Sequence, residues 1–177
     1  MITKTMQTDK PVIANMKLRK KELDILMYLR NNARHTVTSI GRKLNVPRTT
    51  VFEKIKKFKQ AELIRRFTCI PDFNKLGYSI HAYVLFKSEP SKKEELGEGL
   101  ANSAHTNNVL KLGNDFDFMA SLVFQNMEEM HSFIDILTGK YNVKDTKVLY
   151  VTRDLKREGF MSGGVVKPEF DDTAEEL

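Results

Sequence analysis

The residues best suited to chemistry lie in one basic segment, residues 36–66. Lysine and arginine can neutralise the phosphates of a nucleic acid, and short polar side chains can reach base edges in a groove of DNA. A helix N-terminus beside a hydroxyl group can also hold a backbone phosphate. The candidate DNA-binding residues are Thr36, Thr38, Arg48, Thr49, Thr50, Glu53, Lys54, Lys56, Lys57, Arg65 and Arg66. Their types predict contacts with double-stranded DNA.

The distribution of charge along the chain points to the same segment. The 177 residues carry a net charge of +6 at pH 7. Residues 17–66 contain fifteen Lys and Arg against four Asp and Glu, a net charge of +11. Residues 68–177 contain twelve against eighteen, a net charge of −6. Such an asymmetry is typical of a segment that contacts a polyanion, and a solvated basic face without a partner is the alternative.

Short helices are predicted to position these side chains. Apolar residues at helical spacing predict a first helix that ends near Asn32. A second helix is expected over residues 38–45, with Thr36 or Thr38 as its N-cap. Pro47 disfavours helical geometry at the residue before it, so the second helix should end in a tight turn there.

A third helix is expected from about residue 48 to residue 61. At about 100° per residue, Val51, Ile55 and Phe58 share one side, and the polar candidates of this helix fall on the opposite side or its flanks. Two helices joined by a tight turn, followed by a basic β wing at residues 63–66, predict a winged helix-turn-helix.

The rest of the chain predicts a domain of mixed strands and helices. Two predicted helices, after residue 91 and after residue 126, separate strands expected at residues 67–72, 78–87, 109–112, 118–124 and 147–152. After the first strand, which links the two halves, the order is βαββαβ, the split βαβ plan of ferredoxin-like domains. Both helices would cover one face of the sheet. The strands are apolar at nearly every position, so we expect a partner subunit on the other face.

The predicted fold class is therefore α+β, with five segments along the chain. They are a flexible arm (1–16), a winged helix-turn-helix domain (17–66), a linking strand and turn (67–77), a ferredoxin-like domain (78–153) and an acidic, flexible tail (154–177).

The remaining residue types give no recognisable catalytic or metal site. The four histidines lie far apart in the sequence, and Cys69 is the only cysteine. An intrachain disulfide and a cysteine zinc cluster are thereby excluded. No apolar run approaches the roughly 18 residues that a membrane span needs. We expect no enzyme activity, cofactor, metal or membrane contact, and a cytoplasmic location.

One acidic turn in the second half could bind a small molecule. Gly113, Asn114, Asp115 and Asp117 combine backbone amides, which can hold a carboxylate, with aspartates that can pair with an ammonium group. These groups suit an amino acid. The alternative, which the residue types alone favour, is a turn whose Asn and Asp side chains satisfy their own backbone.

In their order and spacing, these residues resemble the Lrp/AsnC (leucine-responsive, or feast/famine) transcription regulators. The resemblance covers about residues 18–153. It rests on Leu18, Ile25-Leu26, Leu29, Asn32-Ala33-Arg34, the run from Leu44 to Val51, Lys54-Ile55, Leu63-Ile64, Leu76-Gly77, and Gly113 with Phe116-Asp117. Departures from the family pattern are Pro47 in place of a helix-capping serine, a Gly-to-Asp turn one residue longer, and the additional arm and tail.

The resemblance implies a winged helix-turn-helix joined by a strand to a ferredoxin-like effector domain. It implies homodimers that pair through their sheets and often assemble into octamers. It also implies a near-palindromic promoter site, and a small effector, commonly an amino acid, near Gly113 and Asp117. Two alternatives stay open: an enzyme like the siroheme decarboxylases, in which His81 or His105 beside Tyr83 or Arg153 could form a site, and an architectural DNA-binding protein of low specificity.

Overall fold

The computed structural model describes residues 17–113 and 115–162. Within this part of the chain, one compact unit comprises residues 17–68 with 158–162, and a second comprises residues 69–157. The predicted arm and residues 163–177 of the predicted tail lie outside the described residues. None of the helices in the described ranges is long and apolar enough to cross a membrane.

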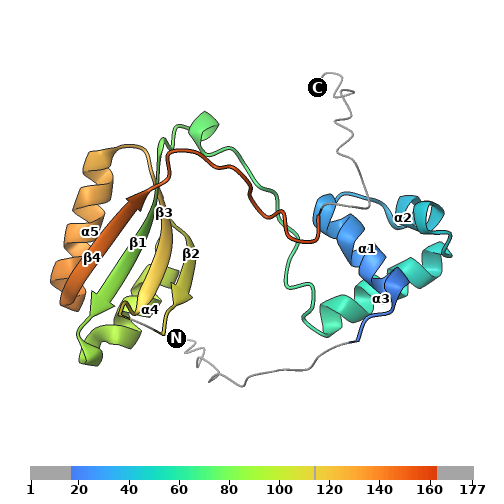
Figure 1. Cartoon of the computed structure of the whole chain (residues 1–177), viewed down its shortest axis with the longest axis horizontal. Helices are drawn as coiled ribbons and strands as arrows, with labels where there is room; N and C mark the ends of the chain where they lie inside the picture. The colour runs from blue at the N-terminus through green and yellow to red at the C-terminus, as the bar shows by residue number, and fades with distance from the viewer. Residues whose placement is uncertain (1–16, 114, 163–177) are drawn as a thin grey trace, which may run out of the picture. The chain divides into compact units, whose positions relative to one another are not determined.

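The first unit contains three helices, as predicted: α1 (Lys20–Asn31), α2 (Val37–Leu44) and α3 (Arg48–Gln60) (Figure 1). They share a core of buried apolar side chains. Its members are Ile25, Tyr28, Leu29, Ile40, Val51 and Phe58. The helical periodicity of the sequence therefore identified the inward side of α3 correctly.

The tight turn between α2 and α3 depends on local backbone chemistry. Thr36 is the N-cap of α2, and its hydroxyl accepts a hydrogen bond of 3.1 Å from the Ser39 N–H. Asn45 ends the helix with a left-handed φ of 50°. A Cβ atom on Gly41 would lie 2.6 Å from the carbonyl oxygen of Val46, so only glycine lets the chain turn back this closely.

The second unit is the predicted ferredoxin-like domain. Its elements are β1 (Ile80–Ser88), α4 (Lys93–Ala101), β2 (Thr106–Lys111), β3 (Phe118–Phe124), α5 (Met127–Tyr141) and β4 (Val143–Tyr150), with short 3-10 turns at Asn74–Leu76 and Pro90–Lys92. The strands form one antiparallel sheet in the order β2-β3-β1-β4. The sequence predicted this order of elements, although β4 begins four residues earlier than expected.

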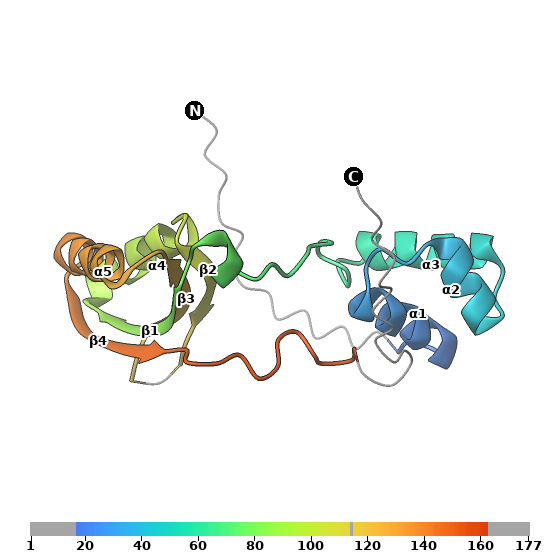
Figure 2. The same ribbon diagram turned by 90° about the horizontal axis from the view of Figure 1, so that it is seen from above.

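Helices α4 and α5 cover one face of the sheet, as Figure 2 shows. Between helices and sheet lies a dry core that includes the fully buried Phe86, Leu96, Leu122, Phe124 and Met130. Burial of such side chains is worth about 1.5–3 kcal/mol each relative to exposure, which makes this core the main stabilising feature of the unit.

The opposite face of the sheet also carries apolar side chains. Leu85 on β1 is paired with Met119 on β3, which is paired in turn with Leu110 on β2. Tyr83 on β1 is paired with Leu149 on β4. Leu110 and Leu149 are 52% and 43% exposed in the single chain. The helices of its own unit leave this face uncovered, and its apolar side chains lie beside polar ones: Leu85 is also paired with Lys147, and Tyr83 with Ser121. The expectation that the strands are apolar at nearly every position is wrong for β2 and β4, whose sequences include Asn107, Asn108, Lys144 and Asp145.

Two of the predicted strands are absent. Residues 65–72, which include the predicted linking strand and the end of the predicted wing, form no strand in the described chain. The ladders of the sheet join only β1 to β3 and β4, and β2 to β3. Residues such as Phe67 and Ile70 suit a strand, but a strand needs a neighbouring strand to pair with, and these side chains are 48% and 54% exposed.

Candidate nucleic-acid interface

The exposed side of α3 carries five of the eleven predicted DNA-binding residues. Thr49, Thr50, Glu53, Lys56 and Lys57 are all exposed, whereas Val51 and Phe58 on the other side are buried. The fold thus presents two cations, two hydroxyl groups and one carboxylate on a single helical surface. Such a surface can pair with phosphates and offer hydrogen bonds to base edges.

A shallow hollow of about 410 Å³ lies beside the start of this helix, at the turn between α2 and α3. Thr38 and Arg48, two of the predicted contacts, line it. Arg42, which the sequence analysis did not select, lines it as well. Thr36 does not line it, and its hydroxyl is already occupied as the cap of α2. The hollow combines two guanidinium groups with a helix N-terminus, which suits a phosphate group.

Lys54 differs from the other candidates on α3 because its ammonium group forms an ion pair with Glu22 on α1. Glu22 also accepts a 2.8 Å hydrogen bond from the Arg19 N–H at the start of α1. The hydrogen bond from Lys54, followed by that from Arg19, holds the pKa of Glu22 below its ordinary value. Lys54 therefore ties α3 to α1 in this structure.

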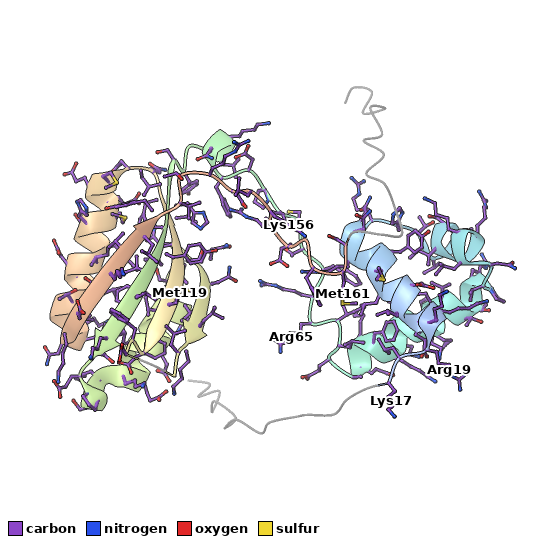
Figure 3. The ribbon with its side chains drawn as sticks, in the orientation of Figure 1. Lys17, Arg19, Arg65, Met119, Lys156 and Met161 are labelled. Carbon is purple, nitrogen blue, oxygen red and sulfur yellow. The ribbon has the colours of Figure 1, made fainter. Side chains whose placement is uncertain are left out.

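Arg65 and Arg66 are exposed and follow α3 on a segment without a strand. Arg65 is labelled on this segment in Figure 3. The structure brings neither residue into a β wing. Both stay predicted contacts to the DNA backbone, carried by a segment without regular secondary structure.

Phe52 also lies on α3 and was missed by the sequence analysis. Its side chain is 57% exposed, in contrast to Phe58 at 3%. Its spacing in the sequence could have identified it. Phe52 lies four residues after Arg48 and four before Lys56, in a row with these two cations and apart from Val51 and Phe58 on the buried side.

The predicted effector turn has a different construction from the one its residue types suggested. The Asp117 carboxylate accepts hydrogen bonds from the Ser88 N–H (2.9 Å) and hydroxyl (3.1 Å), and it forms an ion pair with Lys93. Burial raises the pKa of Asp117, but these hydrogen bonds outweigh it and hold the pKa below its ordinary value. Gly113 and Asp115 are exposed, and Asn114 lies outside the described residues.

The histidines do not gather into one site. His81 lies on the face of the sheet away from α4 and α5, where its Nε2 atom is 2.9 Å from the Ser121 hydroxyl and its ring centroid is 5.4 Å from that of Tyr83. His105 stacks instead on Phe124, at 4.7 Å. Burial, and then the charge of Arg157, lowers the pKa of His81. Among the described residues, no three His, Cys, Asp or Glu side chains could hold a metal ion together.

Comparison with known proteins shows what this chain is similar to. The model of the MarR family matches residues 18–70, which span the three helices and the segment after them. The HTH-type transcriptional regulator FL11 of Pyrococcus horikoshii is 27% identical over 143 residues, which cover 80% of this chain and 95% of that protein.

Solved structures extend the likeness to both units. The AsnC family transcriptional regulator of Agrobacterium tumefaciens has a TM-score of 0.72 at 15% identity, over 79% of this chain and 94% of its own. The resemblance to the Lrp/AsnC transcription regulators is confirmed. Another structure with this fold is the complex of the Neisseria meningitidis regulator NMB0573 with L-Met, with a TM-score of 0.74 at 15% identity over 79% of this chain and 93% of its own.

Proposed function

We propose that this Lrp/AsnC-like protein is a cytoplasmic regulator that binds specific promoter DNA through α3. The observation that carries the proposal is the exposed polar surface of this helix, opposite its buried side at Val51 and Phe58. Residues 17–66 would bind DNA, residues 67–77 would form the link, and residues 78–153 would bind the effector and form the dimer. The regulators among the relatives support this function, and we propose no catalytic role.

The free face of the sheet supports a homodimer, which could assemble further into an octamer. Leu85, Met119 and Leu110 form an apolar row across three strands, next to Tyr83 and Leu149. A second copy placed on this face would remove these side chains from water. A twofold dimer presents two α3 helices, so its DNA site would be a near-palindrome with half-sites about one helical turn, or a multiple, apart.

A small effector, such as an amino acid, is proposed at the turn from Gly113 to Asp117. The L-Met complex of the Neisseria regulator with the same fold supports an amino acid. Because Asp117 is already paired with Ser88 and Lys93, an effector would meet the backbone of the turn and the exposed Asp115 first. Binding there would shift the balance between oligomeric states and so change promoter occupancy.

Fluorescence anisotropy with DNA from upstream of the protein's own gene tests the proposed function. The duplex should bind tightly, bind less tightly as salt rises, and exceed a scrambled duplex in affinity by about a thousandfold. Lys56→Ala and Lys57→Ala should each lower the salt slope by about 0.9 per lost phosphate contact, or about 1.8 for a dimer that loses one contact in each copy, whereas Thr49→Ala should change sequence preference. Lys140→Ala, on α5 of the other unit, is the matched control and should change neither.

Two outcomes would contradict this function. Equal affinity for both duplexes, repeated with sites selected from random DNA, would indicate an architectural protein. Absence of binding at low salt, together with stoichiometric uptake of a tetrapyrrole, would instead indicate a decarboxylase-like enzyme.

A further inference from the structure

Phe52 is an apolar side chain on a surface that is otherwise built for polar contacts. It is 57% exposed, while Phe58 on the same helix is 3% exposed and Phe86 and Phe124 in the other unit are fully buried. The core of the first unit does not include Phe52. Its ring is therefore available to a partner of α3 and contributes little to the packing of the three helices.

The position of Phe52 on α3 favours DNA as this partner. Residues four apart lie in a row along a helix, so Arg48, Phe52 and Lys56 form one row on the exposed surface. The ring therefore lies between two cations, Arg48 and Lys56. These cations suit a polyanion better than an apolar protein surface. A helical side chain leans toward the N-terminus of its helix, so the ring covers the first turns of α3. In helix-turn-helix proteins these turns approach the base edges.

The chemistry of a phenyl ring restricts what it can contact there. It has no hydrogen-bond donor or acceptor for a phosphate or for the polar edge of a base. The C5 methyl group of thymine is the apolar group that base edges present in the major groove. Contact between an exposed phenyl ring and this methyl group would remove apolar surface from water on both molecules.

We propose that Phe52 determines specificity by packing against the C5 methyl group of a thymine in each half-site. This inference rests on the proposed function, and it adds an aromatic apolar contact that Glu53 and the lysines do not provide. Thymine and uracil differ only by the methyl group, so Phe52 should distinguish the two bases although their hydrogen bonds are the same.

Replacement of thymine by deoxyuridine in the DNA tests this directly. A duplex selected for tight binding from random DNA is prepared with each thymine replaced in turn, and affinities are measured by fluorescence anisotropy with the full chain. At one position of each half-site the wild type should lose about fourfold in affinity, the effect expected for one buried methyl group. At the remaining positions affinity should stay within the error of the measurement.

Phe52→Ala should bind the thymine and deoxyuridine duplexes equally at that position, and its salt slope should equal that of the wild type because no phosphate contact is lost. Phe52→Leu should keep part of the difference. Circular dichroism should show both variants folded, since the side chain is outside the core. Ile136→Ala, which truncates an exposed apolar residue (66%) on α5, is the matched control and should retain the full fourfold difference.

The outcomes separate this inference from the function on which it rests. Tight and specific binding with no sensitivity to any deoxyuridine would overturn the role of Phe52 and leave the regulator intact. An unchanged difference between thymine and deoxyuridine in Phe52→Ala would also overturn it. Absence of binding to selected DNA would overturn the proposed function, and the inference with it.

Discussion

Substitution of Asp117 by asparagine would distinguish a carboxylate that stabilises the fold from one that is kept for an effector. The carboxylate holds the start of β3 to the end of β1 through Ser88, and to the start of α4 through Lys93. Asparagine keeps the size of the side chain and one acceptor oxygen, but it removes the charge. The ammonium group of Lys93 would then lose its partner.

The expected loss of stability follows from these contacts. The Asp117 side chain is 18% exposed, so solvent screens its interactions only in part. Hydrogen bonds to charged groups contribute about 1.5–3 kcal/mol each. Both Ser88 bonds go to the same oxygen, Oδ2, so the one acceptor oxygen of asparagine can keep both in neutral form, whereas the ion pair with Lys93 at Oδ1 is lost. We expect the free energy of unfolding to fall by about 2 kcal/mol, which corresponds to a decrease in Tm of roughly 10 °C for a domain of this size. Thermal and urea denaturation of the full chain measure both quantities.

The pH dependence provides a second readout, with a sign that the pKa shift fixes. Because the folded-state pKa of Asp117 lies below its ordinary value, its stabilisation is complete above about pH 4 and is lost as pH falls through the folded pKa. The difference between wild type and Asp117→Asn should therefore close in acid. Asp115→Asn, on the exposed part of the same turn, should behave as wild type at every pH. Equal Tm values for wild type and Asp117→Asn at pH 7 would refute this reasoning.

Two further predictions concern contacts within each unit. A Cβ atom on Gly99 would lie 2.4 Å from the Tyr141 hydroxyl, so Gly99→Ala should lower the free energy of unfolding by about 1–3 kcal/mol in urea denaturation. Gly139→Ala, with no atom within 4 Å of the new Cβ, should raise it by up to about 1 kcal/mol, and equal effects of the two would contradict the geometry. Glu22→Gln should free Lys54 for a phosphate and steepen the salt slope of DNA binding by about 0.9 per copy, or about 1.8 for the dimer, in anisotropy. An unchanged slope would show that Lys54 does not reach the DNA.

Local signals predicted the helices of the first unit well because these signals act over a few residues. Pro47 sets the start of α3, and apolar residues at spacings of three and four set its buried side. The observed end at Gln60 differs by one residue from the expected end. The same local signals predicted the order of strands and helices in the second unit. Apolar residues recur at every second position in many strands and at every third or fourth position in helices, and a stretch of about ten residues is enough to tell these spacings apart.

The partners of polar side chains were not predictable in the same way. Periodicity reports which side of an element is apolar, but it says nothing about which polar groups meet across elements. Lys54 and Glu22 are 32 residues apart, and Asp117 and Ser88 are 29 apart. Only the folded arrangement of α1, α3 and the sheet brings them together. Residues 67–72 illustrate the same limit, because residue types that suit a strand do not specify the neighbouring strand that must pair with it.

These contacts also change what the charge of the DNA-binding region implies. The net charge of +11 over residues 17–66 overstates the cations free to meet phosphates, because Lys54 is paired with Glu22 and Arg30 is paired with Glu158. Within the part of the chain that the structure describes, the cations among the predicted contacts that remain unpaired are Arg48, Lys56, Lys57, Arg65 and Arg66. If each of the five meets one phosphate, a dimer neutralises about ten, and the logarithm of affinity should fall with the logarithm of salt with a slope of about −9. A much steeper slope for the wild type would require cations from outside this surface, and a much shallower one would show that the segment after α3 does not reach the DNA backbone.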